Sequence, residues 1–160
     1  MSIVVSDTSP IRALAHLELI EILRQLYGTV VIPTAVRIEL ANALTSEKLR
    51  TAIPEWMQIR APSNIAEVSR LRIELDPGES EAIALAVEID ADYLLIDEWA
   101  GREVAASMGL TRVGVIGVLL QAKRHGIIPA IRPLIDRLRS EIKFRVSDAL
   151  YARVMHDAGE

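Results

Sequence analysis

The stretch "IVVSDTSPIRALA", residues 3–15, passes within a few residues from an apolar run to the start of a helix. Residues 3–5 form a short β-branched run, and the pair that follows predicts a helix with Ser9 as its N-cap and Pro10 at the first helical position. Asp7 lies between the two, just past the expected strand. A strand that is apolar on both faces and leads directly into a helix is typical of the buried parallel sheet of an α/β fold.

The same alternation continues along the chain. Further apolar runs predict strands at 29–32, 93–96 and, more weakly, 111–114, and the irregular stretch 54–62 could hold an edge strand. Helical patterns with start and stop signals occupy 9–26 with a break near His16, 33–44, 46–53, 63–75, 79–89, 98–109, 114–126, 129–142 and 147–159. With no repeat or linker, we expect one α/β domain over residues 1–160.

Composition narrows the class of protein. The chain has no cysteine, which excludes disulfides and thiolate metal sites and favours a reducing cytoplasm. No export signal is recognisable, and no apolar run approaches the roughly 20 residues that span a bilayer, so we expect a cytoplasmic protein without a membrane segment. The net charge of -4 excludes a simple basic nucleic-acid binder. Residues 121–145 are nevertheless net +5.

Several acids fall where an α/β sheet places its ligands. Asp7 and Asp97, with Glu98 beside it, directly follow expected strands, and ligands bind outside the carboxyl ends of parallel strands. Glu39 borders the apolar stripe of the helix over 33–44, and Glu79 begins a helix in line with its buried alanines. Carboxylates brought together repel one another unless a cation holds them, and Mg²⁺ or Mn²⁺ is the usual cation.

Each acid also has a purely structural interpretation. "DPGE" at 76–79 fits a capping box with Asp76 as N-cap and Glu79 at the third helical position, and local rules alone favour capping for Glu79. Asp7 could simply stabilise the turn before the helix by hydrogen bonding to nearby backbone. Asp97 and Glu98 could be acids in the first turn of a helix, where the helix dipole favours negative charge. Glu81 lies about 200° around the helix from Glu79, so the two cannot easily serve one site, and Glu81 is the reserve candidate.

Basic residues could hold a phosphate backbone. Arg102, Lys123 and Arg124 are the candidates, and a solvated helix face is the alternative. A phosphate-binding loop is excluded because "GVIG" at 114–117 lacks the required glycine pattern and lysine. No serine has the glycine spacing of a nucleophile elbow.

Five stretches, taken in order, resemble the PIN-domain superfamily, in particular a prokaryotic branch related to VapC-type toxins. They are "VVSDTSPI", "VVIPTAVRIEL", "LDPGESEAIALA", "LLIDEWAGREVAASMGL" and "GVIGVLLQAKRHGIIP". The resemblance implies a three-layer α/β/α domain with a central, mostly parallel sheet of four or five strands. It also implies an acidic site for Mg²⁺ or Mn²⁺ that hydrolyses RNA.

Residue by residue, the resemblance matches Asp7 to the first acid, with Thr8 or Ser9 as its polar neighbour, and Glu39 to the second. Counting back from Ala86 places Glu79 third, and Asp97 or Glu98 follows the later strand. The metal ligands expected are therefore Asp7, Glu39, Glu79, Asp97 and Glu98. A toxin would have a small antitoxin partner over the acidic site, and we also expect a homodimer.

Two rival functions were weighed against this ribonuclease hypothesis. A non-catalytic module could keep the fold while binding nucleic acid or a protein partner. A phosphatase of another α/β family is less favoured, because "SDTSP" lacks a second acid two residues after Asp7.

Overall fold

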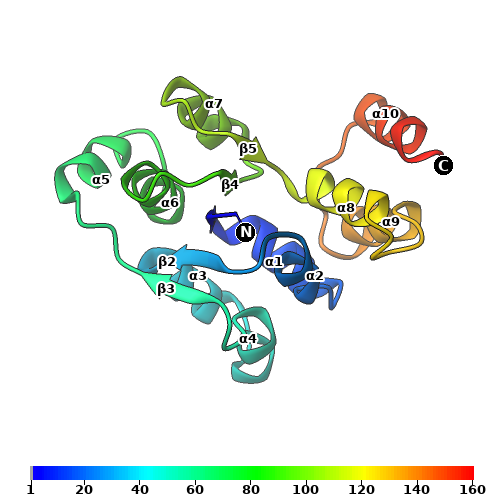
Figure 1. Cartoon of the computed structure of the whole chain (residues 1–160), viewed down its shortest axis with the longest axis horizontal. Helices are drawn as coiled ribbons and strands as arrows, with labels where there is room; N and C mark the ends of the chain where they lie inside the picture. The colour runs from blue at the N-terminus through cyan, green and yellow to red at the C-terminus, as the bar shows by residue number, and fades with distance from the viewer. Residues whose placement is uncertain (1) are drawn as a thin grey trace.

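A five-stranded, all-parallel sheet forms the centre of the computed structural model, which describes residues 2–160 (Figure 1). The strands are β1 (Val4–Ser6), β2 (Val30–Pro33), β3 (Gln58–Arg60), β4 (Tyr93–Leu95) and β5 (Arg112–Val113). Their order across the sheet is β3-β2-β1-β4-β5. The predicted fold class is confirmed, and the stretch 54–62 does contain an edge strand.

Helices connect and cover these strands. They are α1 (Thr8–His16), α2 (Glu21–Tyr27), α3 (Thr34–Ala43), α4 (Ser46–Ala52), α5 (Ile65–Leu71), α6 (Pro77–Glu88), α7 (Trp99–Ser107), α8 (Val115–Arg124), α9 (Arg132–Glu141) and α10 (Asp148–Ala158). The break expected near His16 separates α1 from α2.

Alternate residues of the central strand enter two different cores. Val4 packs with residues of α1, α2 and α8, whereas Val5 packs with residues of α5, α6 and α7. Both valines are fully buried, as a strand covered on each face requires. The three-layer arrangement follows from this alternation.

The first helix begins earlier than its sequence signals suggest. Ser9 was the expected N-cap, but Asp7 occupies that position and α1 starts at Thr8, so Pro10 is the third helical residue. Proline is tolerated there because the backbone N–H groups of the first turn have no partner inside the helix. The expectation for Ser9 was wrong, and the difference places Asp7 directly between β1 and α1.

Strand order locates the functional edge of the sheet. From β1 the chain moves to β2 and β3 on one side, then returns to place β4 and β5 on the other. The connections therefore diverge between β1 and β4, and a crevice forms at the carboxyl ends of such strands. Asp7 follows β1 and Asp97 follows β4, so both lie at this edge.

The last two helices, α9 and α10, form a carboxyl-terminal arm, which is seen at the right of Figure 1 and is attached to the rest of the domain mainly through α8. Glu160 fastens it: its carboxylate accepts hydrogen bonds from the backbone N–H of Ile131 at 2.8 Å and of Arg132 at 3.1 Å. Lys123 Nζ donates to the same carboxylate at 2.8 Å and to the carbonyl of Ala158 at 2.6 Å. Burial raises the pKa of Glu160, but these donors outweigh it and lower the pKa to about 2.

No helix within residues 2–160 combines the length and apolar character needed to cross a bilayer.

We predict that Glu160→Gln lowers the free energy of unfolding by about 1–2 kcal/mol near neutral pH, because charge-assisted hydrogen bonds are lost. The folded-state pKa lies below the ordinary value of 4.5, so this stabilisation is present above that value and is lost as the pH falls toward about 2. Urea unfolding at a series of pH values measures it. Glu55→Gln, at an exposed position, is the control. A difference between wild type and Glu160→Gln that does not shrink in acid would contradict the prediction.

Candidate metal centre

Asp7 occupies the end of the central strand with its carboxylate almost fully enclosed. The residue is 4% exposed, and its backbone N–H donates to the carbonyl of Leu95 at 2.9 Å, which ties the end of β1 to β4. Although Asp7 stands at the N-cap position of α1, its side chain makes no capping hydrogen bond. Its carboxylate is therefore not consumed by starting the helix.

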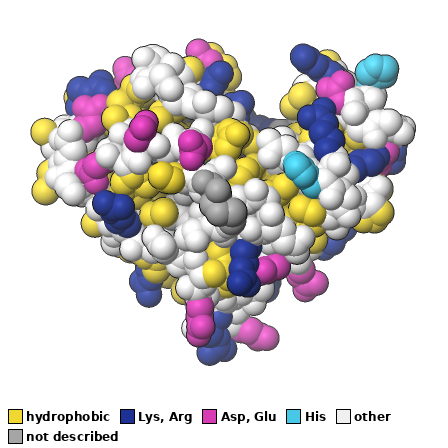
Figure 2. Space-filling model, viewed as in Figure 1, with side chains coloured by type: hydrophobic (Ala, Val, Ile, Leu, Met, Phe, Trp, Pro, Cys, Tyr) yellow, Lys and Arg dark blue, Asp and Glu magenta, His cyan; other side chains and the backbone are white. Residues whose placement is uncertain are grey.

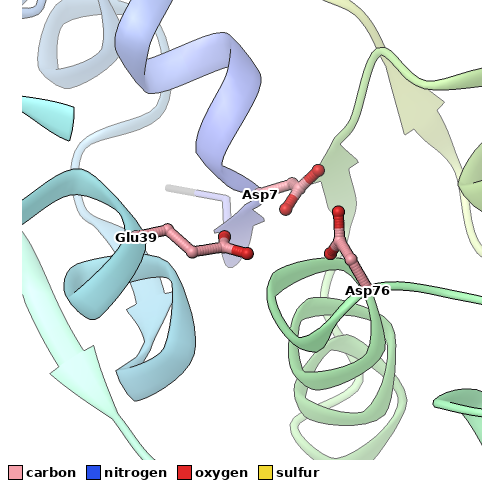
Figure 3. A group of neighbouring side chains, drawn as sticks. All are labelled: Asp7, Glu39 and Asp76. Carbon is pink, nitrogen blue, oxygen red and sulfur yellow. The ribbon is translucent and has the colours of Figure 1, made fainter. Parts of the chain in front are cut away.

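Two further carboxylates meet Asp7 from other elements. Glu39 reaches it from the middle of α3 and Asp76 from the start of α6, and the three point toward one another (Figure 3). One oxygen from each can be chosen so that all lie within 4.8 Å of one another. Glu39 accepts a hydrogen bond from the hydroxyl of Thr8, which holds that carboxylate in place.

The environment of this group disfavours negative charge. Burial raises the pKa of Asp7 well above its usual value, and repulsion from Asp76, Glu79 and Glu39 raises it further, while the backbone N–H of Thr8 opposes the shift in part. Solvent exposure increases across the group: Asp7 is buried, Glu39 is half-buried and Asp76 is exposed. The group is therefore open to solvent on the side of Asp76. A hard divalent cation fits this donor set, because Mg²⁺ and Mn²⁺ favour carboxylate oxygens and retain several waters.

Asp76 was expected only as a cap. The capping box is present: Asp76 Oδ1 accepts from the backbone N–H of Glu79 at 2.8 Å, and Glu79 Oε1 accepts from the backbone N–H of Asp76 at 3.3 Å. Capping uses one oxygen of Asp76, so the other stays available for a cation. The signal that could have found Asp76 was its place: α6 packs on β1 and β4, so its N-cap belongs at the same sheet edge as Asp7.

Glu79 combines the capping role with a place beside the group. It is 7% exposed, and burial together with the neighbouring Asp76 raises its pKa to about 7. Its charge also acts on Asp7. The two interpretations of this residue, capping and proximity to the acidic site, are therefore compatible.

Glu81 has a different partner. Its carboxylate accepts a hydrogen bond from the backbone N–H of Ala35 at 3.0 Å, at the start of α3. That bond satisfies a donor that a helix leaves unpaired. Glu81 thus links α6 to α3, consistent with the separate face inferred from helical geometry.

Asp97 stands apart from the three-carboxylate group. Its Oδ1 accepts from the backbone N–H of Val115 at 2.9 Å, where α8 begins, while its Oδ2 is buried without a hydrogen-bond partner in the described part of the chain. Burial raises its pKa to about 6, against the lowering effects of Val115 and Arg102. A buried carboxylate oxygen without a protein partner is rare, and a cation near it would satisfy it. Glu98, at the N-cap of α7, is exposed and makes no capping bond.

Glycines make room for the acids. A Cβ on Gly78 would overlap the carboxylate of Glu39, one on Gly101 would lie 2.7 Å from Glu79 Oε2, and one on Gly114 would lie 2.8 Å from Asp97 Oδ1. Three of the expected acids, Glu39, Glu79 and Asp97, therefore pack against a glycine where a Cβ would force the carboxylate to shift.

Comparisons with known proteins agree with this arrangement. A family model described as a PIN domain matches residues 3–160. The chain belongs to the PIN domain family. A solved structure of a PilT N-terminus domain protein from the hyperthermophilic archaeon Sulfolobus solfataricus P2 is similar to the fold at a TM-score of 0.57 and 20% identity, covering 75% of this chain and 92% of that one. No curated protein matches the chain.

Next to the acids of this PIN domain runs a groove of about 1010 Å³ between α7 and the carboxyl-terminal arm. Figure 2 shows the molecule hollowed at the top between these two lobes. Ser9, Asp97 and Glu98 line it, so the groove reaches the segments that directly follow β1 and β4. We call it the basic groove, because its basic lining residues are Arg12, Arg102, Arg112, Lys143, Arg145 and Arg153, against the acids Asp97, Glu98 and Asp157.

The three expected phosphate-binding residues occupy different places. Arg102 lines the basic groove, with Nη1 donating to the carbonyl of Ile96 at 2.8 Å. Lys123 is instead bound to Glu160, and Arg124 is exposed at the end of α8; neither lines the groove. Lys143 and Arg145 come from the basic segment noted in the sequence, whereas Arg12 and Arg153 come from distant helices that only folding brings to it.

We predict that Asp7→Asn raises the free energy of unfolding in EDTA at pH 7, because it removes a charge that burial and the neighbouring acids disfavour. The folded-state pKa of Asp7 is raised, so ionising this group costs stability as the pH rises past its ordinary value of 3.8. The gain should vanish near pH 3, where the carboxyl is protonated in both states. Chemical denaturation at the two pH values measures it, and Glu103→Gln, exposed on α7, is the control. If Asp7→Asn instead lowers the free energy of unfolding at pH 7, the folded state does not disfavour the charge on Asp7 and the prediction is wrong.

We also predict that Gly78→Ala weakens Mn²⁺ binding by roughly tenfold or more, comparable with the loss of a residue that orients a ligand. The new methyl group displaces the Glu39 carboxylate, a flexible end that can rotate away, so the fold survives. Calorimetric Mn²⁺ titration measures the change. Gly117→Ala on α8, where the Cβ meets only Val113, should leave affinity unchanged. Equal Mn²⁺ affinity in wild type and Gly78→Ala would show that Glu39 is not a ligand.

Proposed function

We propose that this PIN domain is a metal-dependent endoribonuclease that hydrolyses RNA phosphodiester bonds with Mg²⁺ or Mn²⁺. The observation that carries the proposal is the convergence of Asp7, Glu39 and Asp76 at the carboxyl edge of the parallel sheet. Members of the PIN domain family are typically nucleases, which supports the assignment.

The residues divide the work between holding a cation and holding the substrate. Asp7, Glu39 and Asp76 would ligate the ion, and Thr8 keeps Glu39 oriented. A bound divalent cation supplies an activated water and neutralises charge on the phosphate. In the reaction, a water oxygen would form the new bond to phosphorus and release one proton to solvent, while the bond to the departing nucleotide oxygen breaks and that oxygen takes one proton from solvent.

Glu79 and Asp97 complete the proposed site at its flank. Glu79 fixes the first turn of α6 through the capping box and so fixes Asp76. Asp97 brings a buried oxygen without a partner toward the groove that would hold RNA. Both, with Glu98 beside them, stay proposed ligands for a cation.

The basic groove supplies the means to hold the RNA backbone. Formal charges along its lining favour a polyanion, and phosphate contacts position a nucleic acid without reading its sequence. Within residues 2–160, the side chains of Arg12, Lys143, Arg145 and Arg153 make no hydrogen bond or ion pair, so they are available for phosphate.

The proposal extends to a cytoplasmic toxin of a toxin–antitoxin pair. A small antitoxin would cover the acidic site, and the toxin would act as a homodimer. Family membership is the support for these partners.

We expect the purified chain to cleave a mixed single-stranded RNA pool with Mn²⁺, and Asp7→Asn and Asp76→Asn to lose at least roughly 100-fold in rate, because each removes a ligand. Glu103→Gln should cleave as the wild type does. Gel analysis of the products, with EDTA added to parallel samples, measures the rates.

Equal cleavage by wild type, Asp7→Asn and Asp76→Asn would indicate a contaminating nuclease and contradict the proposal. Mn²⁺ binding without cleavage would instead favour the alternative of a non-catalytic binding module.

A further inference from the structure

The side chain of Trp99 neither packs in a core nor forms a hydrogen bond within residues 2–160. The chain has three Tyr, two Trp and one Phe, all within the described residues. The other five are engaged: Tyr27 packs on Tyr93, Trp56 donates to Glu21, Tyr151 donates to Asp136 and Phe144 packs against the core. The Trp99 side chain is 76% exposed, its indole N–H makes no hydrogen bond within residues 2–160, and it belongs to neither core.

Exposure alone would carry nothing, since single apolar side chains at a surface are common. Ile65, for example, is 75% exposed on α5 outside the basic groove. Trp99 differs in its position. It is the first residue of α7, two residues after Asp97, and it lines the basic groove.

The neighbours of Trp99 suit one nucleotide. Arg102 lies three residues along α7 and therefore on the same side of the helix. Phe144 and Arg145, from the segment between α9 and α10, line the same groove. An aromatic face beside cationic side chains is the combination with which proteins bind single-stranded nucleic acids, stacking the base and pairing the phosphate.

We propose that Trp99 is a stacking platform for an unpaired base of the RNA, at the point where the strand passes from the basic groove to the acidic site. This rests on the proposed function for the identity of the ligand. Trp99 thereby selects single-stranded over duplex RNA, because a base can stack on a side chain only when it is free of its helix.

The test uses intrinsic fluorescence, which reports binding and not cleavage. Trp56→Phe leaves Trp99 as the only tryptophan, and a short single-stranded oligouridylate is titrated into the full chain in EDTA to prevent cleavage. We expect quenching of Trp99 emission by the single strand and little quenching by duplex RNA. Equal quenching by both, or none, would overturn the proposal.

Affinity gives a second readout. Trp99→Ala should bind the oligouridylate roughly tenfold to a hundredfold more weakly, as loss of one stacked base does, and Trp99→Phe should keep part of the affinity. Ile65→Ala is the matched control for an exposed apolar truncation and should bind as the wild type does. Unchanged affinity in Trp99→Ala would refute stacking.

Salt dependence separates stacking from charge. Trp99→Ala should leave the slope of log affinity against log salt unchanged, whereas Arg153→Gln should make it shallower by about 0.7, the value for one lost phosphate contact on a single strand. A changed slope in Trp99→Ala would count against the proposal. If the single strand quenches Trp99 but the wild-type chain cleaves RNA no faster than Asp7→Asn does, the nuclease function is overturned and the stacking site stands.

Discussion

The enclosed carboxylate of Asp7 is the constraint on which the site depends. It stands at the end of the strand that occupies the middle of the sheet, where neighbours on both sides exclude water. Desolvating a carboxylate without an opposite charge is costly, and Glu39 and Asp76 add repulsion to that cost. Since the three-carboxylate group contains only oxygen acceptors of one sign, a hard cation would satisfy all of them at once, and the enclosure that costs stability would then favour cation binding.

Local sequence rules predicted most of the fold because the strands are short, apolar and punctuated. Residues 3–5 and 29–32 were interpreted as buried strands, and the capping box at 76–79 marked the start of α6, which begins at Pro77, two residues before the helical pattern expected from 79. The error at Ser9 arose because serine followed by proline satisfies helix-start rules, whereas the helix begins where β1 ends. The attachment of the arm through Glu160 lay outside such rules, because it joins positions far apart in the chain.

The candidate site could be predicted where an acid directly follows a strand. It was harder to predict where one residue both caps a helix and belongs to the acidic group. Asp7 and Glu39 were expected together and do lie together. Asp76 was assigned to capping because the capping box explained it fully, although that bond occupies only one of its oxygens. Asp97 was placed at the correct edge, but its hydrogen bond to Val115 depends on how α8 docks, which no local pattern encodes.

Segregation of charge would let this acidic protein hold the RNA of the proposed function. The net charge of -4 hides a groove whose charged lining residues are mostly basic, and these basic residues come from α1, α7, β5, the segment that follows α9, and α10. Lys143 in that segment has a positive φ of 55°, which turns the chain back so that Phe144 and Arg145 follow the groove. The carboxyl-terminal arm thus contributes one wall, and its attachment to α8 sets the position of that wall relative to α7. RNA affinity would then depend on monovalent salt through the groove, and cleavage on the divalent cation through Asp7, Glu39 and Asp76, because none of these three acids lines the groove.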